Sequence, residues 1–346
     1  MTKTFASIAG VSGFVPEQVL TNNELARIVD TTDEWIVRRT GIKERHILKS
    51  GLGTSFMASR AVSGLLQKTS TSPDDIDLLI CATATPDFPF PATANLICDL
   101  VGINGPASFD LNVACSGFIY ALSTASQFIE TGKYENIIVV GADTMSANTD
   151  YTDRTTSTLI GDGAGAILLK PNARTGLLDF LLYSDGSGYR ALFQPAGGSR
   201  EPATPQTVAA KRHFWSLDGR TIYKHAVVRM SQVFTDLLKR NNLTADMIDW
   251  FVPHQANRRI IEMIADQHKF PRERVMTTIQ KYGNTIAASI PLCLWDYEPA
   301  LKRGDRMILA SFGSGFTWAG AYLEWDLESD RRPVAGTFSP EMAEVH

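Results

Sequence analysis

The sequence lacks the features that mark several classes of protein. None of its apolar runs reaches the roughly 18 residues of a membrane-spanning helix, and its first residues contain no hydrophobic signal-peptide region. Four cysteines are too few for a disulfide framework, which favours a reducing compartment. The net charge of -4, with 33 Lys and Arg against 37 Asp and Glu, disfavours a generally basic nucleic-acid binder. We therefore expect a cytoplasmic protein with no membrane or nucleic-acid partner.

What the sequence does contain is typical of a large globular α/β protein. Its 346 residues are too many for one simple core, so we expect two packed domains or two halves that share an interface. Hydrophobic residues make up 44% and charged residues 20%, which excludes a chain that is disordered throughout. Apolar runs predict buried strands at 77–84, 136–142 and 307–312, and helical periodicity predicts helices at 54–67 and 116–131. This alternation predicts an α/β architecture.

A stretch rich in proline and glycine, residues 171–214, interrupts the alternation and marks the boundary between two halves. Beyond it the pattern predicts a mostly helical stretch, a strand and a second helix, at 215–245, 250–252 and 256–268. Near the N-terminus, Asn22 or Asn23 is expected to cap a helix that runs through Val29. The expected organisation is an N-terminal half, connecting loops, a C-terminal half and a polar tail, over residues 1–175, 176–214, 215–327 and 328–346.

One of the four cysteines differs from the others in its surroundings. Cys81, Cys98 and Cys293 stand among apolar neighbours and are expected to be small core residues. Cys115 follows a strand-like run and precedes a helix, and its small neighbours permit a tight turn between the two. A thiol at the N-terminus of a helix is close to unpaired N–H groups and to the positive end of the helix dipole, which favours a thiolate nucleophile. The alternative is a buried cysteine that merely begins a helix.

The six histidines do not show the close spacing of a zinc site, so we expect no metal centre. His254 follows a strand-like run, 249–253, and is expected to open a helix. This is where α/β folds commonly bind ligands, and the helix dipole there disfavours an imidazolium ion. A neutral ring at this position can donate a hydrogen bond. A capping or core histidine is the alternative.

Three glycine-containing segments are ambiguous when each is taken alone. Asn284 follows Gly283, and the local pattern favours a simple turn. Residues 312–316 (FGSGF) follow a predicted strand and are typical either of a hairpin or of a loop that offers backbone N–H donors to an oxyanion. Residues 161–166 (GDGAGA) are superficially similar to a phosphate loop. They lack Gly-Lys-Ser/Thr and precede a strand, so we reject nucleotide binding and expect a turn there.

Together these motifs identify a family. The sequence resembles the β-ketoacyl-[acyl-carrier-protein] synthase III family of condensing enzymes, because its motifs follow one another in the order found in that family. The resemblance extends from near residue 5 to about residue 325. Each motif is weak alone, but the ordered set is specific. The resemblance is carried by residues 32–36 (TDEWI), 39–42 (RTGI), 114–118 (ACSGF), 161–165 (GDGAG), 253–257 (PHQAN), 283–285 (GNT) and 315–318 (GFTW).

The resemblance implies a fold and a reaction. The fold is the thiolase-like α/β fold, five αβαβα layers built from two similar halves. The family's Cys–His–Asn triad falls on Cys115, His254 and Asn284. Cys115 would take an acyl group from acyl-CoA, and His254 and Asn284 would stabilise the enolate formed when malonyl-carrier protein loses carbon dioxide. Backbone N–H groups of Cys115 and Ser314 would hold the acyl oxyanion; members commonly have Gly at the Ser314 position, and a backbone donor survives that change.

The resemblance also implies binding surfaces and an assembly. The coenzyme A and pantetheine wall would be formed by Trp35, Arg39, Thr40, Arg154 and Asn257. Phe90 would cross a homodimer interface to cap the acyl pocket. Lys224 and Arg259 match basic positions that meet the acidic carrier protein, although a solvated surface role is the simpler reading for single cations. No cofactor is implied, because acyl-CoA and malonyl-carrier protein are substrates.

The function that follows is a β-ketoacyl-[acyl-carrier-protein] synthase III that begins fatty-acid synthesis in the cytoplasm as a homodimer. One alternative is a relative on the same fold that serves secondary metabolism, as an acyltransferase or a condensing enzyme with another donor or acceptor. Another is a non-catalytic partner subunit, which would be expected to lack the nucleophile. The presence of Cys115, His254 and Asn284 favours decarboxylative condensation over both.

Overall fold

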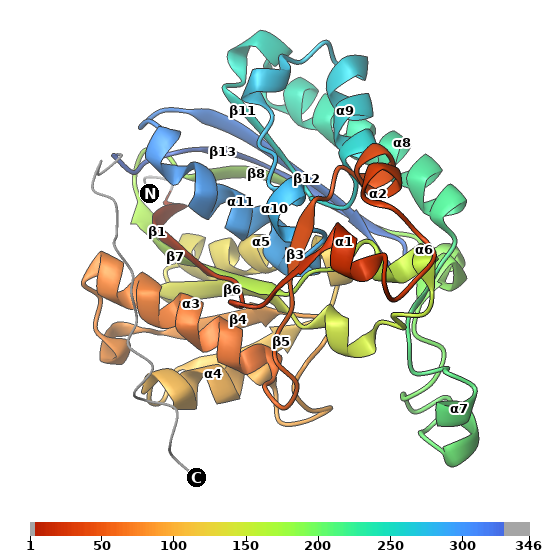
Figure 1. Cartoon of the computed structure of the whole chain (residues 1–346). Helices are drawn as coiled ribbons and strands as arrows, with labels where there is room; N and C mark the ends of the chain where they lie inside the picture. The colour runs from red at the N-terminus through yellow and green to blue at the C-terminus, as the bar shows by residue number, and fades with distance from the viewer. Residues whose placement is uncertain (1–3, 329–346) are drawn as a thin grey trace.

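Two β-sheets form the framework of the computed structural model, which describes residues 4–328 (Figure 1). The first sheet has the order β1–β7–β6–β4–β5, with bounds Phe5–Phe14, Gly163–Asn172, Ile137–Asp143, Leu78–Ala82 and Ala107–Leu111. The second has the order β11–β12–β13–β8, with bounds Trp250–Pro253, Arg306–Gly313, Thr317–Glu324 and Leu177–Ser184. Strand β4 is parallel to β5 and β6, and β11 is parallel to β12, while β7 and β13 are antiparallel to both of their neighbours. The parallel strands are those that crossover helices connect.

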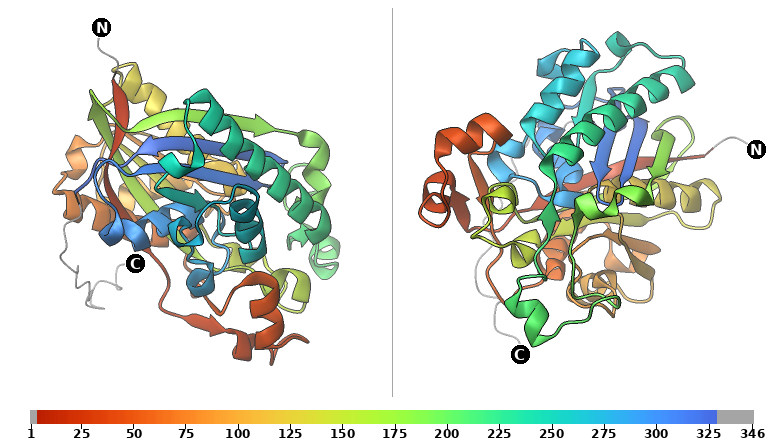
Figure 2. Two further views of the ribbon diagram at one scale, coloured as in Figure 1. Left: turned by 90° about the horizontal axis from the view of Figure 1, so that it is seen from above. Right: turned by 90° about the vertical axis from the view of Figure 1, so that its right-hand side faces the viewer.

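The sheets alternate with three layers of helices (Figures 1 and 2). Helices α3 (Thr54–Thr69) and α4 (Thr93–Val101) pack on the outer face of the first sheet, and α8 (Gly219–Arg240) and α9 (Arg258–Gln267) pack on the outer face of the second. Helices α5 (Gly117–Glu130) and α11 (Ser289–Tyr297) lie between the sheets. The predicted five-layer αβαβα thiolase-like fold is therefore confirmed.

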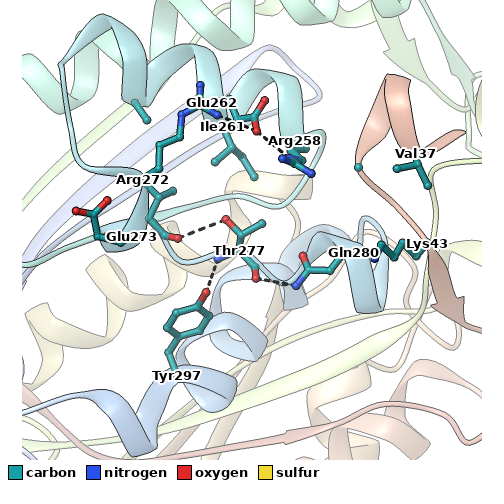
Figure 3. A pocket seen from close by; sticks show the side chains of 13 residues that line it. Val37, Lys43, Arg258, Ile261, Glu262, Arg272, Glu273, Thr277, Gln280 and Tyr297 are labelled. Atoms are coloured by element: carbon teal, nitrogen blue, oxygen red, sulfur yellow. Dashed lines mark hydrogen bonds and ion pairs between the residues drawn. The ribbon is translucent and has the colours of Figure 1, made fainter. Parts of the chain in front are cut away.

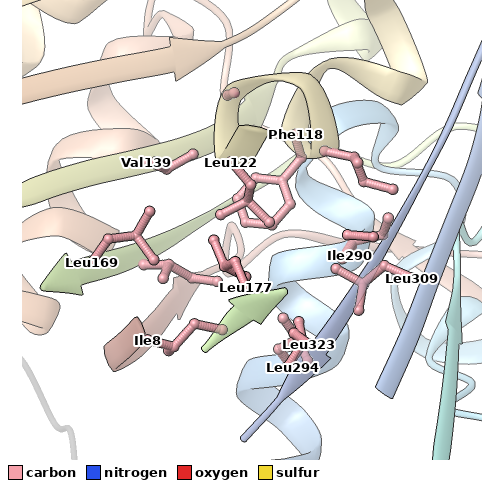
Figure 4. Packing of buried hydrophobic residues seen from close by; sticks show 14 of the residues in the cluster. Ile8, Phe118, Leu122, Val139, Leu169, Leu177, Ile290, Leu294, Leu309 and Leu323 are labelled. Carbon is pink, nitrogen blue, oxygen red and sulfur yellow. The ribbon is translucent and has the colours of Figure 1, made fainter. Parts of the chain in front are cut away.

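The central layer contains the largest shared core (Figure 4). Phe118 and Leu122 of α5 pack with Val139 of the first sheet, Leu309 of the second and Ile290 of α11. All seven residues of β6 are buried, because helices cover both faces of the sheet. That burial explains why β6 has a continuous apolar sequence instead of an alternating one. The two halves thus share one interior, and the loops at the ends of their strands meet.

Shorter elements complete the chain. The remaining strands are β2 (Val19–Thr21), β3 (Glu44–His46), β9 (Leu192–Phe193) and β10 (Ser216–Leu217), and the remaining helices are α1 (Asn22–Leu25), α2 (Asp33–Thr40), α6 (Arg154–Ser157), α7 (Pro205–Ala209) and α10 (Ile279–Tyr282). Short 3-10 helices occur at η1 (Pro73–Asp75), η2 (Ala114–Ser116), η3 (Met145–Asn148), η4 (Gly186–Ala191), η5 (Ala245–Met247), η6 (Arg272–Arg274), η7 (Ile286–Ala288) and η8 (Glu298–Ala300). Of these, η2 and η7 bear on the site described below.

The N-terminal helix differs from its prediction. Helix α1 ends at Leu25 instead of Val29, and its N-cap is Thr21, not Asn22 or Asn23. The Thr21 hydroxyl accepts from the Glu24 backbone N–H, and the Glu24 carboxylate accepts from the Thr21 backbone N–H, which is a reciprocal capping box. The side chain of Asn22 is buried in the tertiary structure, where it bonds Ile42 and Arg45.

The boundary between the halves also needs a correction. The segment 176–214, predicted as connecting loops, begins with β8, which is the edge strand of the second sheet. Only Leu177 and Leu181 of this strand are buried, so its apolar signal is weak beside the glycines and prolines that follow. The rest of the segment carries the short helix α7, which projects from the body of the molecule (Figure 1). Most of the predicted polar tail, 329–346, lies outside the described residues.

Within residues 4–328, none of the helices has both the length and the apolar composition that crossing a bilayer requires.

Candidate active site

A cavity of about 850 Å³, hereafter the larger cavity, opens where loops from both halves meet. Its wall contains most of the residues that the sequence singled out: Trp35, Arg39, Thr40, Cys115, Arg154, His254, Asn257, Arg259, Asn284 and Ser314. Two of the predicted residues, Phe90 and Lys224, do not line it. The candidate residues, which are far apart in the sequence, therefore share one space.

Cys115 lies in η2, the single turn between β5 and α5. The residue before it, Ala114, has a φ of 45°, a left-handed conformation that a non-glycine residue adopts only under strain. On the opposite side, Gly313 approaches so closely that a Cβ there would stand 2.9 Å from the Cys115 Cβ. Cys115 is thus held between a strained turn and the backbone of β12. No side chain caps the first turn of α5, so the helix N-terminus stays open beside it.

The protonation state of Cys115 differs from its prediction. Burial raises the pKa of the thiol to about 12, and the buried Asp143 carboxylate adds to the rise. The surroundings are apolar, because Cys115 clusters with Ile160 and Ile286. The expectation of a resting thiolate is therefore corrected to a resting thiol, since desolvation outweighs the helix N-terminus. The three other cysteines are buried as predicted, and none forms a disulfide within residues 4–328.

His254 is buried just after β11, and its two ring nitrogens have different surroundings. Nδ1 lies 2.6 Å from the Ser289 Oγ. Nε2 is buried and has no hydrogen-bond partner among the described residues. Burial lowers the pKa of the ring to about 3, so the imidazole is neutral. Helix α9 begins only at Arg258, so the prediction that His254 opens a helix is wrong, and desolvation is what keeps the ring neutral.

Asn284 occupies a short connection that joins the two halves. Its backbone N–H donates to the Leu159 carbonyl at 2.8 Å, and Asn284 forms a bridge with Ile160. Its side-chain Oδ1 accepts from the Ile286 N–H at 3.0 Å, which leaves the Nδ2 amide as the donor end. Ile286 has a φ of 52°, which is exceptional for a β-branched residue. The backbone is therefore strained at two positions that line the larger cavity, Ala114 and Ile286.

Asp143 is a site residue that the sequence did not reveal. Its buried carboxylate accepts from the Ala84 N–H, the Thr85 hydroxyl and the Ala287 N–H, at 2.8 to 2.9 Å. These contacts connect the ends of β4 and β6 with the segment that follows Asn284. Burial raises the pKa of the carboxyl to about 6. An acid at the end of the apolar run 137–143 was the available signal, but only the tertiary structure identifies its partners.

One end of the larger cavity is built around Trp35. Thr32 caps α2 by accepting from the Trp35 N–H, and four-residue spacing puts Trp35 and Arg39 on one face of that helix. The Arg154 guanidinium lies 4.9 Å from the ring centroid of Trp35, and that of Arg39 lies 5.7 Å away. The Thr40 hydroxyl is already engaged, because it donates to the Ile36 carbonyl and accepts from the Ile42 N–H. Thr40 therefore shapes the wall but has little left to offer a ligand.

Of the other predicted residues, three also line the larger cavity and two lie outside it. Asn257 caps α9 through its Oδ1. Ser314 belongs to the turn between β12 and β13, and its hydroxyl donates to the Leu192 carbonyl at 2.6 Å. Arg259 is exposed and lies 5.4 Å from the ring centroid of Tyr223. Lys224 is exposed on α8, while Phe90 is 84% exposed in the single chain.

Apolar side chains surround Cys115, and the sequence did not assign them. Ile160, Ile286, Ala84, Met145 and Trp215 pack in one cluster with Cys115, and all of them line the larger cavity. Trp215 comes from the segment after α7, and its indole N–H donates to the Thr149 hydroxyl. A hydrophobic chain attached to Cys115 would find apolar walls here. The glycine segment 161–166 is not part of this wall; Asp162 accepts from the Leu48 and Ser146 N–H groups and shapes the turn before β7.

A second cavity of about 490 Å³, hereafter the smaller cavity, lies between α2, α9 and the segment 272–280 (Figure 3). Three of its charged side chains, Arg258, Glu262 and Arg272, form ion pairs with one another or with Asp266. The Glu262 carboxylate accepts from Arg258 at 2.8 Å and from Arg272 at 2.9 Å, and Arg272 also pairs with Asp266. Across residues 4–328, no cluster of three or more His, Cys, Asp or Glu side chains is arranged to hold a metal ion.

Comparison with known proteins gives consistent matches. The models for 3-oxoacyl-[acyl-carrier-protein] synthase III and for its C-terminal region match residues 109–186 and 238–325. A β-ketoacyl-[acyl-carrier-protein] synthase III of Bacteroides thetaiotaomicron is 48% identical over 333 residues, covering 96% of this chain and 99% of the relative. The crystal structure of a 3-oxoacyl-[acyl-carrier-protein] synthase III from Aquifex aeolicus matches with a TM-score of 0.85 and 39% identity, covering 92% of this chain and all of that one. The priming β-ketosynthase of the R1128 polyketide pathway matches with a TM-score of 0.87 and 30% identity, covering 94% of this chain and 97% of that one.

Proposed function

The chain belongs to the β-ketoacyl-[acyl-carrier-protein] synthase III family of condensing acyltransferases, and from this premise we propose that Cys115, His254 and Asn284 condense an acyl primer with malonyl-carrier protein. One observation carries the assignment of residues. A buried thiol, an unpartnered ring nitrogen and a free amide donor line the same cavity. Of the nine buried side-chain polar atoms without a partner in residues 4–328, only the His254 Nε2 belongs to a residue that lines this cavity, where a ligand can supply the missing partner.

In the first stage, the Cys115 sulfur attacks the thioester carbonyl of an acyl-CoA. The bond from the carbonyl carbon to Sγ forms, the bond to the coenzyme A sulfur breaks, and the proton of the Cys115 thiol is taken up by the departing thiolate. The open N-terminus of α5 stabilises negative charge on sulfur as it approaches the carbonyl. Backbone N–H groups of Cys115 and Ser314 receive the oxyanion, because Gly313 lets the β12–β13 turn lie against the nucleophile.

In the second stage, malonyl-carrier protein loses carbon dioxide and its thioester oxygen becomes an enolate oxygen. His254 Nε2 and Asn284 Nδ2 donate hydrogen bonds to that oxygen. A neutral ring suits this role, because an imidazolium ion could transfer a proton and quench the carbanion. The carbanion then attacks the acyl-Cys115 carbonyl, and the Cys115 thiolate leaves. A proton from water restores the resting thiol.

The substrates would enter past Trp35. An adenine ring would stack on the indole, and Arg154, now over that ring, would swing to the other face of the base. Arg39 and Arg259 supply positive charge for the phosphates, with Asn257 beside the pantetheine arm and Thr40 in the wall behind it. The apolar cluster around Cys115 would enclose the primer chain. No cofactor takes part in either stage.

Protein partners are part of the same proposal. The exposed cations Lys224 and Arg259 lie beside the Tyr223 wall of the larger cavity, which suits an acidic carrier protein docked over the mouth. Phe88 and Phe90, whose rings are exposed, follow β4 in the sequence. Strand β4 is the neighbour of β5, which is an edge strand of the first sheet. A second copy of the chain, in a cytoplasmic homodimer, would bury them.

The alternatives on the same fold are less well supported. Among the solved structures, the synthase III of Aquifex aeolicus is 39% identical to this chain, whereas the priming β-ketosynthase of the polyketide pathway is 30% identical. A non-catalytic subunit would have no need of a buried thiol beside two hydrogen-bond donors. Both alternatives remain outcomes of the test that follows.

The test separates the two stages of the reaction. Incubation with an acyl-CoA should add one acyl mass to Cys115 in intact-protein mass spectrometry, and malonyl-carrier protein should then release carbon dioxide. His254→Ala should slow carbon dioxide release about 100-fold or more while self-acylation stays measurable. No adduct on the wild-type protein would support the non-catalytic subunit, and an adduct without carbon dioxide release would support another acyltransferase.

A further inference from the structure

The catalytic histidine is backed by one buried hydroxyl. Ser289 is the first residue of α11 and is 2% exposed, and its Oγ lies 2.6 Å from the Nδ1 of His254. The ring nitrogen on the other side, Nε2, is buried and has no partner among residues 4–328. A neutral imidazole carries one proton, which resides on one nitrogen or the other. The Ser289 contact therefore determines what Nε2 presents to the larger cavity.

The direction of this hydrogen bond follows from the partners of Ser289. The Gln255 backbone N–H donates to the Ser289 Oγ at 3.4 Å, so the oxygen already serves as an acceptor there. The hydroxyl proton is then left for the other contact of this oxygen, the one of 2.6 Å, which is short enough to require a proton between the two atoms. In the described part of the chain, the His254 Nδ1 is the single acceptor recorded within reach of it. Ser289 therefore donates to Nδ1, and the proton of the imidazole belongs on Nε2.

We propose that Ser289 is a positioning residue that fixes His254 in the tautomer with its proton on Nε2. In this tautomer Nε2–H donates to the enolate oxygen of the second stage. In the other tautomer a lone pair of Nε2 would face that oxygen and repel it. The proposal rests on the proposed function for the role of the donor, but the tautomer itself can be measured without any substrate.

The second donor of the site is fixed by a similar device. Asn284 Oδ1 accepts from the Ile286 N–H. The amide NH2 could not take this place, because two donors cannot form a hydrogen bond with each other, so Nδ2 is the end left for the ligand. Ile286 and Ser289 belong to one continuous segment, η7 followed by α11. Asp143 holds this segment in place by accepting from the Ala287 N–H at 2.9 Å. One short segment thus orients both donors toward the larger cavity.

The direct test is spectroscopic. In protein labelled with [15N]histidine, the protonated and unprotonated ring nitrogens give well-separated signals in a two-bond 1H–15N spectrum. The His254 signals are identified by their absence from His254→Gln. In the wild type at pH 7 we expect the proton on Nε2, and in Ser289→Ala a loss of that single state. A wild-type signal with the proton on Nδ1 would overturn the proposal.

The kinetic test compares three serine variants. Ser289→Ala should slow carbon dioxide release about tenfold and change self-acylation less than threefold, since only the second stage uses the Nε2–H donor. Ser289→Thr restores a hydroxyl and should recover most of the loss. Ser311→Ala is the matched control, because Ser311 is equally buried, lies on β12 and has an Oγ without a partner in residues 4–328. Equal decarboxylation in Ser289→Ala and the wild type would overturn the proposal.

The outcomes also separate this proposal from the proposed function. If the wild type carries the proton on Nε2 and His254→Ala still decarboxylates at the normal rate, the positioning of the ring stands and its catalytic role fails. If His254→Ala blocks decarboxylation but the proton is on Nδ1, the catalytic role stands and the part given to Ser289 fails. Melting temperatures of the variants show whether a loss of fold explains a loss of rate.

Discussion

The two cavities of this molecule differ in how far their polar groups are satisfied. The smaller one is rich in charge, and Glu262 pairs with both Arg258 and Arg272 at its surface, beside Lys43 and Glu273. The larger one contains a buried ring nitrogen with no described partner, and a buried thiol. Unfilled hydrogen-bonding capacity, rather than the number of charges, therefore distinguishes the candidate active site from the smaller cavity.

The backbone shows the same contrast. Ala114 and Ile286 adopt left-handed conformations beside Cys115 and Asn284, and such strain costs on the order of 1–3 kcal/mol at each position. None of the residues that line the smaller cavity is a non-glycine residue with a positive φ. Strain of this kind persists only where the surrounding packing enforces it. Variants in the two cavities should therefore differ sharply in their effect, in the order below.

The largest effect is expected from Cys115→Ser. The hydroxyl is a much poorer nucleophile than the thiol, so acyl transfer from acyl-CoA should fall by about 1000-fold or more. Intact-protein mass spectrometry after incubation with acyl-CoA measures the adduct. Cys98→Ser, in α4 and outside the larger cavity, should acylate normally. Acylation of Cys115→Ser at the wild-type rate would exclude Cys115 as the nucleophile.

The next effect concerns stability and pH. The folded-state pKa of His254, about 3, lies below its ordinary value of 6.5. As the pH falls through this interval, the unfolded chain binds a proton that the folded chain does not, so stability present above pH 6.5 is lost toward pH 3. His254→Gln has no ring to protonate. Between pH 7 and pH 5, the unfolding free energy of this variant should therefore decrease by roughly 2 kcal/mol less than that of the wild type. Urea denaturation at both pH values measures the difference. Equal decreases in unfolding free energy for the variant and the wild type would mean that the His254 ring is exposed to water in the folded state.

A smaller effect is expected at the Trp35 end of the larger cavity. Trp35→Ala removes a stacking surface that contributes about 1–3 kcal/mol per base, so KM for acyl-CoA should rise about tenfold with kcat nearly unchanged. A short acyl thioester without the nucleotide is the control, because it does not reach Trp35. If KM for both substrates rose equally, Trp35 would support the fold of α2 instead of binding a base.

The smallest effect is expected in the smaller cavity. Glu262→Gln removes the ion pairs of Arg258 and Arg272. Both arginine side chains are about half exposed to water, and a lost ion pair there costs less than about 1 kcal/mol. Condensation rates should stay within about twofold of the wild type in a coupled assay. A loss comparable with that of Trp35→Ala would mean that the smaller cavity takes part in the reaction, and the contrast between the cavities would fail.

The sequence by itself determined the fold class and named most of the residues of the candidate site. Continuous apolar runs such as 137–142 identified the buried strands, and apolar neighbours identified Cys81, Cys98 and Cys293 as core residues. These features are local, since periodicity and nearest neighbours are written along the chain. The ordered motifs then gave the family, and with it Cys115, His254 and Asn284.

Only the tertiary structure decided the states of those residues. The sequence predicted a thiolate and a helix-end histidine, whereas burial gives a resting thiol and a ring that is neutral through desolvation. It also could not show that Asp143 joins the two halves, that β8 belongs to the second sheet, or that Ser289 lies behind His254. Burial and hydrogen-bond partners arise where segments distant in the chain meet, so they depend on packing that no local pattern contains.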